Sequence, residues 1–296
     1  MSDQEREVLL GMLSESGPDL SAPPPKARAD FETMMEAMPV GEDVTFTEKT
    51  IGGVPALHSL TPGADAGRTL LYLHGGAYVI GSPKAYRALA SNLARAAGVS
   101  GLSLDYRLAP EHPFPAAVDD AVAAYRALLD EGKAPGSIAI AGDSAGGGLT
   151  MATLVAARRA GLPMPAAAFV ISPWVDLACE GASITGKAEA DPILTRDGLL
   201  AMAAHYLQGT GARDALASPL HADLSGLPPL LIQVGSDEIL LDDATVLAAR
   251  AGAAGVRVRL DVWPRMPHVW HAFSFMLSEG RDAIAEAGAF LNARFA

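Results

Sequence analysis

Residues 137–160 read SIAIAGDSAGGGLTMATLVAARRA, and this stretch decides the fold. Its apolar beginning, Ser137–Ala141, predicts a short buried strand, and Leu149–Ala160 has the composition of a helix. Between them lies the pattern G-x-S-x-G, with Ser144 at its centre. Glycines on both sides of the serine allow a strand to turn sharply into a helix, which exposes the hydroxyl at the carboxyl end of the strand. A glycine-rich turn with an N-capping serine is the purely structural alternative.

Apolar strands and helical segments alternate along most of the chain. Strands are predicted at Asp43–Glu48, Pro55–Leu60, Thr69–Leu73, Val99–Leu104, Ser137–Ala141, Ala166–Ile171, Leu230–Val234 and Val256–Val262. Helices are predicted at Lys84–Ala97, Pro115–Asp130, Ala145–Ala160, Ile239–Ala254 and Gly280–Ala296. This alternation predicts an α/β fold with a mainly parallel sheet and helices on both faces. The turn Ile51-Gly52-Gly53 predicts an antiparallel leading edge.

Two segments depart from the alternation. The first 45 residues contain helical stretches around a proline-rich break, and the interval from Ile171 to Leu230 exceeds what one crossover needs, with Pro192–Leu207 helical. We therefore expect an N-terminal helical cap segment (1–45) and a cap insertion (183–215). The α/β core is expected in two parts, 46–182 and 216–296. One side of the second N-terminal helix carries Phe31, Met34, Met35 and Met38. We expect these side chains to pack in the core, with the lining of an adaptable pocket as the alternative.

The composition excludes several functional classes. The chain has 296 residues, half of them hydrophobic, and a formal net charge of −12. An acidic chain without a basic cluster is not expected to bind nucleic acid. The single cysteine, Cys179, cannot form an intrachain disulfide or a cysteine-rich metal site, so a buried hydrophobic role is predicted. The sequence shows no signal peptide and no stretch that could span a membrane, so a cytoplasmic protein without a membrane partner is expected.

A second motif, His74-Gly75-Gly76-Ala77-Tyr78, follows the strand predicted at Thr69–Leu73. A serine that attacks a carbonyl creates an oxyanion, which needs preorganised N–H donors. The amides of Gly75, Gly76 and Ala145 are the predicted three-donor hole. A phosphate-binding loop is the alternative interpretation of this glycine pair, but the stretch lacks the G-x-x-x-x-G-K spacing of such loops. We expect His74 to support the loop rather than to transfer protons.

A nucleophilic serine also needs a base and an acid that orients the base. Of the histidines after Ser144, only His268 and His271 follow the last predicted strand. His268 is the predicted base and His271 the alternative; a metal-binding pair is disfavoured because cysteine or carboxylate companions are lacking nearby. The predicted acid is Asp237, in the loop directly after Leu230–Val234. Glu238, Asp242 and Asp243 are expected in a helix, as caps or partners of its dipole.

With these residues, the chain resembles the hormone-sensitive-lipase-like carboxylesterases, bacterial family IV of the α/β-hydrolases. The similarity runs from about residue 45 to the end and rests on HGGAY, GDSAG, GSDEILLDD, MPHVWHAF, DYRLAPE and SPWVD. One departure is Ala77, where many members have a third glycine; its backbone amide remains.

The resemblance implies an eight-stranded sheet with a helical cap, no cofactor, a small ester as substrate and often a homodimer. The implied activity is a serine carboxylesterase that hydrolyses short-to-medium acyl esters through an acyl-enzyme. The alternatives are a lactonase, an N-acyl amidase or an acyltransferase with the same triad, or a non-catalytic receptor for a small ligand. Receptor relatives lose the histidine, so the presence of His268 argues against the last alternative.

Overall fold

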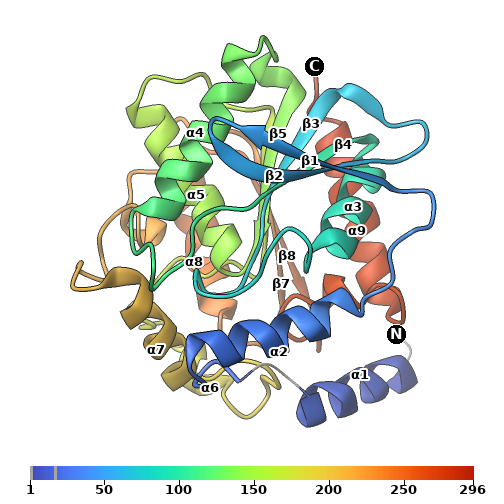
Figure 1. Ribbon diagram of the computed structural model, residues 1–296. Helices are drawn as coiled ribbons and strands as arrows, with labels where there is room; N and C mark the ends of the chain where they lie inside the picture. Colours follow the sequence, from blue (N-terminus) through green and yellow to red (C-terminus); the bar gives the residue numbers. More distant parts are fainter. Residues whose placement is uncertain (1–2, 17–18) are drawn as a thin grey trace.

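A single mixed sheet organises the computed structural model, which describes residues 3–16 and 19–296 (Figure 1). The eight strands follow the order β1-β2-β4-β3-β5-β6-β7-β8. Their bounds are β1 Thr45–Ile51, β2 Val54–Leu60, β3 Asp65–Leu73, β4 Val99–Leu104, β5 Ile138–Asp143, β6 Ala167–Ile171, β7 Leu230–Gly235 and β8 Val258–Trp263. The pairings of β1 with β2 and of β2 with β4 are antiparallel, and the other five are parallel. The predicted fold and its antiparallel edge are confirmed.

Helices cover both faces of the sheet. Figure 1 shows α3 (Arg87–Ala97) and α9 (Ser278–Asn292) on one face. The other face carries α4 (Ala116–Asp130), α5 (Ala145–Arg159) and α8 (Leu241–Ala253). Every residue of the central strands β5, β6 and β7 is buried, as expected for strands covered on both sides.

The remaining helices gather at the carboxyl ends of the parallel strands (Figure 1). They are α1 (Asp3–Ser16) and α2 (Pro24–Glu36) from the N-terminal segment, and α6 (Ser183–Gly186) and α7 (Arg196–Leu207) from the insertion. The short helix α6 was not predicted. Residues 1–2 and 17–18 of the expected N-terminal cap segment lie outside the described residues.

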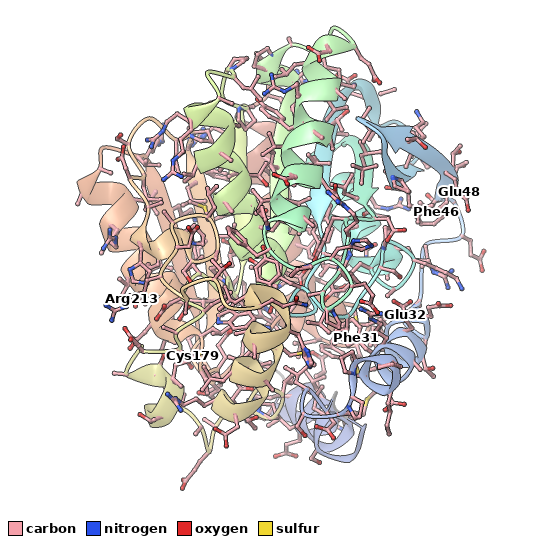
Figure 2. The ribbon with its side chains drawn as sticks, turned by 60° about the vertical axis from the view of Figure 1, so that its left-hand side comes forward. Phe31, Glu32, Phe46, Glu48, Cys179 and Arg213 are labelled. Carbon is pink, nitrogen blue, oxygen red and sulfur yellow. The ribbon has the colours of Figure 1, made fainter. Side chains whose placement is uncertain are left out.

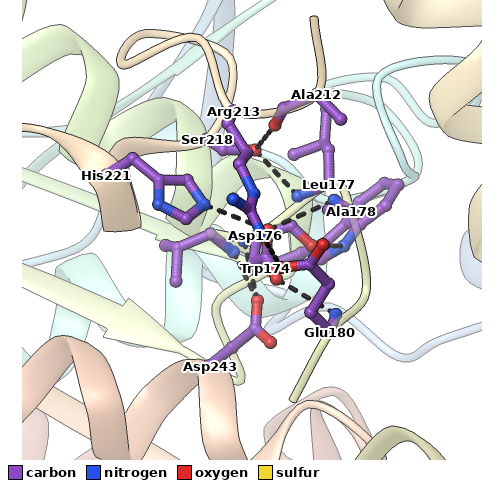
Figure 3. Close-up of polar contacts among 11 residues, drawn as sticks. Trp174, Asp176, Leu177, Ala178, Glu180, Ala212, Arg213, Ser218, His221 and Asp243 are labelled. Atoms are coloured by element: carbon purple, nitrogen blue, oxygen red, sulfur yellow. Dashed lines mark hydrogen bonds and ion pairs between the residues drawn. The ribbon is translucent and has the colours of Figure 1, made fainter.

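The insertion leaves and rejoins the core at a polar cluster around Asp176 (Figure 3). Asp243 Oδ2 of α8 accepts the amides of Val175 (2.8 Å) and Asp176 (2.9 Å). From the segment that follows the insertion, Ser218 Oγ accepts the Leu177 amide (2.8 Å), and His221 Nε2 lies 3.4 Å from Asp176 Oδ1. The two segments that flank the insertion are therefore bonded to one another, and the first of them is bonded to α8.

Within residues 3–16 and 19–296, no helix has the length and apolar character needed to cross a membrane. Cys179 is buried, in agreement with the predicted hydrophobic role, and burial raises the pKa of its thiol to about 12 (Figure 2).

Candidate active site

Ser144 stands at the predicted turn between β5 and α5. Its backbone has φ 53° and ψ −123°, a region that side-chain-bearing residues rarely adopt. The flanking glycines are required by close packing. A Cβ at Gly142 would lie 2.3 Å from the carbonyl oxygen of Gly146, and one at Gly146 would lie 2.0 Å from that of Leu73. The turn therefore holds the serine in a strained, fixed position at the end of the strand.

Ser144 faces a largely apolar cavity with about 630 Å³ of empty space, its open mouth included. The polar residues that line it include Ser144 and His268. Apolar side chains from the N-terminal segment, the insertion and the segment after His268 form its walls: Leu13, Leu20, Phe31, Met34, Met35, Ile193, Leu194, Leu199, Val269, Ala272 and Phe273.

The Phe/Met side of α2 serves both of its predicted uses. Phe31, Met34 and Met35 line the cavity (Phe31 is labelled in Figure 2). Phe31 and Met35 also belong to the continuous hydrophobic core, as does Met38, which is 7% exposed. The expectation of core packing was therefore incomplete, because the pocket wall is continuous with the core.

The loop after β3 corrects the prediction for Gly75. Its amide donates to Asp143 Oδ1 (3.0 Å) and so is not available to an oxyanion. The next two residues turn the chain with positive φ angles, 112° at Gly76 and 52° at Ala77, and both line the cavity. Across the described chain, the amides of Gly76 and Ala77 have no hydrogen-bond acceptor. The available donors in this loop are thus Gly76 and Ala77, one position later than predicted.

Asp143 fixes this loop from the residue before the nucleophile. Its carboxylate is fully buried and accepts hydrogen bonds from the Tyr72 hydroxyl (2.6 Å), the Tyr86 hydroxyl (3.0 Å) and the Gly75 amide. Burial raises the pKa of Asp143 to about 6, against the lowering effect of these hydrogen bonds. A Cβ on Gly75 would lie 2.2 Å from Asp143 Oδ2, so this contact needs glycine.

His74 supports the same loop, as predicted. Its Nδ1 bonds the Gly75 carbonyl oxygen (2.7 Å), and its ring stacks between Tyr106 and Tyr86 at centroid distances of 4.3 Å and 5.5 Å. Burial lowers the pKa of His74 to about 4, so the ring is neutral at physiological pH.

The carboxylate beside His268 belongs to Glu238 and not to Asp237. His268 Nδ1 lies 2.8 Å from Glu238 Oε2. Glu238 is fully buried, and its other oxygen accepts the Ser172 hydroxyl and the Gly235 amide, both at 2.7 Å. A carboxylate held by three hydrogen-bond partners is fixed in one orientation.

Asp237 points away from the cavity, toward the N-terminal helix. Its Oδ2 accepts Arg6 Nη2 of α1 (3.1 Å), and its side chain is 21% exposed. The prediction of Asp237 was wrong because neighbouring side chains in this loop point in opposite directions. A usable signal was the sequence after Glu238: Ile239 and Leu240 are both fully buried, so Glu238 adjoins the apolar side of the turn.

His268 is buried among negative charges. Burial alone would lower its pKa, but the hydrogen bond and charge of Glu238, with the charges of Asp191 and Asp143, raise it above its ordinary value. The alternative base, His271, is fully buried and bonds the Gln233 Oε1 atom (2.8 Å). Burial lowers the pKa of His271 to about 3. Between the two candidates, His268 is the one that lines the cavity with Ser144.

Comparison with known proteins agrees with this geometry. A family model described as alpha/beta hydrolase fold matches residues 70–272. The structure superimposes on that of an esterase from the bacterial hormone-sensitive lipase family with a TM-score of 0.96 and 48% identity, over 100% of both chains.

The chain belongs to the hormone-sensitive-lipase family of α/β-hydrolase esterases. As a member, it is a carboxylic ester hydrolase of the serine type. An acetyl-hydrolase of Streptomyces hygroscopicus is 58% identical over 230 residues, which are 78% of this chain and 77% of that protein. The esterase EstE5, in a crystal soaked with p-nitrophenyl butyrate, is 48% identical with a TM-score of 0.95 over 99% of both chains.

Proposed function

We propose that this esterase hydrolyses short-to-medium acyl esters through an acyl-enzyme on Ser144, with His268 as base and Glu238 as the acid that orients it. The observation that carries the proposal is the 2.8 Å contact between His268 Nδ1 and Glu238, beside a cavity that both His268 and Ser144 line. Glu238 keeps the proton of His268 on Nδ1, so Nε2 is free to accept the serine proton.

In the first step, Ser144 Oγ attacks the ester carbonyl while His268 takes its proton. The amides of Gly76, Ala77 and Ala145 hold the oxyanion that forms, and the loss of one such donor typically costs about 3 kcal/mol of barrier. His268 then protonates the leaving alcohol, and the acyl group stays on Ser144. Water, activated by the same histidine, releases the carboxylic acid and restores the enzyme.

The shape of the cavity supports the preference for shorter acyl chains. Residues 1–45 and 183–215 are proposed to form the cap, because Leu13 and Leu20 from the first and Leu194 and Leu199 from the second line the same cavity. Side chains that close over the reacting serine limit the length of the acyl group.

The test is hydrolysis of p-nitrophenyl acetate, butyrate, octanoate and palmitate by the wild type and by Ser144→Ala. We expect activity on the short esters and its loss in Ser144→Ala with an unchanged circular dichroism spectrum. Activity that persists in the variant would refute the nucleophile, and a preference for palmitate would refute the proposed chain length. Lactones, N-acyl amides and acyl transfer to an alcohol require the same side chains, so the screen includes those substrates.

A homodimer through β8 is also proposed. This strand ends the sheet order, so one of its edges is unpaired within the chain, and Val262 on it is 42% exposed. Unpaired strand edges pair readily with a second copy. Light scattering at micromolar protein should give twice the chain mass, and a monomer mass would refute the proposal. The cytoplasmic location remains a prediction from composition.

A further inference from the structure

Asp191 connects the insertion to the loop that carries Glu238. It lies between α6 and α7, is 9% exposed, and accepts hydrogen bonds from three backbone amides. Oδ1 accepts those of Ile193 and Leu194, both at 2.9 Å. Oδ2 accepts that of Ile239 at 2.8 Å. Asp191 therefore shapes the turn that carries two residues of the cavity wall and also holds the residue next to Glu238.

Ser183, a second residue of the insertion, bonds the backbone carbonyl of Ile239, whose amide is held by Asp191. Ser183 Oγ donates to the carbonyl oxygen of Ile239 (2.6 Å) and accepts the amide of Asp242 (2.9 Å). The amide of Ser183 donates to Asp242 Oδ2 (2.9 Å). Both backbone polar groups of Ile239 are thus bonded to the insertion, which fixes the chain directly after Glu238.

The charge of Asp191 also acts on His268. The carboxylates that face this histidine are Glu238, Asp191 and Asp143, and the charge of each favours the protonated ring. Glu238 contacts the ring directly, whereas Asp191 acts on it through space. During ester hydrolysis His268 becomes an imidazolium, and a buried negative charge nearby stabilises that form.

We propose that Asp191 is a positioning residue, which holds the Glu238 loop against the insertion and stabilises the protonated form of His268. The proposal rests on the proposed function, in which His268 is the base. It assigns the insertion a part in the acid–base chemistry in addition to its part in the cavity wall.

The test compares Asp191→Asn with a matched control, Asp243→Asn. Asparagine at 191 removes the charge and turns an NH₂ group toward the Ile239 amide, so that two donors face each other. Asp243 is another buried carboxylate that accepts two backbone amides, but it lies in the cluster around Asp176 (Figure 3). Both of these amides bond Oδ2, so the oxygen of an asparagine at 243 can still accept them. The control therefore changes a buried carboxyl group away from His268 and keeps its backbone contacts.

The measurements are kcat/KM for p-nitrophenyl butyrate across pH and the thermal midpoint. For Asp191→Asn we expect kcat about tenfold lower. We also expect the acid limb of the profile to move to lower pH by roughly half to one unit, because the ring loses a favourable charge. Asp243→Asn should leave the acid limb in place. Ser183→Ala, a smaller change at the same joint, should lower kcat without moving the acid limb.

The proposal is overturned if Asp191→Asn keeps the acid limb of the wild type, or if Asp191→Asn and Ser183→Ala both keep its kcat. If Asp191→Asn does not fold, Asp191→Glu replaces it: this variant keeps the charge and should keep the acid limb while kcat falls, and a shifted limb would overturn the proposal. A failure of the proposed function is recognised separately, since Ser144→Ala would then remain active.

Discussion

Replacement of Glu238 by glutamine tests the central interaction of the site. Oε1 of Glu238 accepts two donors, the Ser172 hydroxyl and the Gly235 amide. Within residues 3–16 and 19–296, the only partner of Oε2 is His268 Nδ1. The side chain of glutamine has a single oxygen, and we expect this oxygen to occupy the position of Oε1, where it accepts both donors. Its NH₂ group then faces His268 Nδ1, which must become an acceptor, so the ring proton moves to Nε2. A histidine in this tautomer cannot accept the proton of Ser144.

The expected loss follows from that tautomer. Amide replacement of an orienting carboxylate in a serine hydrolase triad lowers kcat by about 10⁴-fold, with the geometry intact. We expect kcat of Glu238→Gln to fall by about 10³- to 10⁴-fold on p-nitrophenyl butyrate, with little change in KM.

Asp237→Asn is the matched control, since it changes the adjacent carboxylate in the same way. It removes only the ion pair with Arg6, which is worth about 0–1 kcal/mol in a partly exposed position. Its kcat should stay within about twofold of the wild type, a change of less than ~0.5 kcal/mol in barrier. If Asp237→Asn lost as much activity as Glu238→Gln, or if Glu238→Gln kept wild-type kcat, the assignment of the acid to Glu238 would be refuted.

Three further predictions concern the loop, the base and the wall of the site. Gly75→Ala should lower kcat by at least about 10²-fold at unchanged secondary structure, because its Cβ would meet Asp143 Oδ2 at 2.2 Å and displace the oxyanion loop; wild-type kcat would contradict this. The neutral ring of His268 is the base, so kcat/KM should fall as pH decreases. Because the pKa of His268 is raised, the midpoint of this fall should lie above the ordinary value of 6.5. A lower midpoint would contradict the electrostatic environment described for His268. Met34→Trp should fill part of the cavity and lower kcat/KM for octanoate more than for acetate, and an equal effect on both esters would show that the acyl group lies elsewhere.

The sequence predicted the sheet, the helices that cover it, and the places of Ser144 and His268 beside one cavity, because these depend on local patterns. An apolar run, a glycine-flanked serine and a histidine after the last strand each lie within a few residues. The carboxylate that contacts His268 lies one position after the predicted acid. Asp237 faces Arg6, which is 231 residues away, and Glu238 meets Ser172, which is 66 residues away. No local pattern contains those partners, so the only local indication of the direction of Glu238 was the apolar pair that follows it.

The prediction that the Gly75 amide is available to an oxyanion was wrong for the same reason: its partner lies far away in the sequence. Consecutive amides in HGGAY are equivalent in the sequence, and only the position of Asp143, on the neighbouring strand, shows which of them is already bonded.

Much of the cavity wall comes from stretches of the chain that carry none of the proposed reacting groups. Side chains of α1, α2 and the insertion line the cavity, whereas Ser144, Glu238 and His268 follow strands of the sheet. Selectivity can therefore drift in evolution while the hydrolytic chemistry is retained. A mutant library confined to residues 1–45 and 183–215, with Ser183 and Asp191 left unchanged, would explore new esters on one catalytic framework.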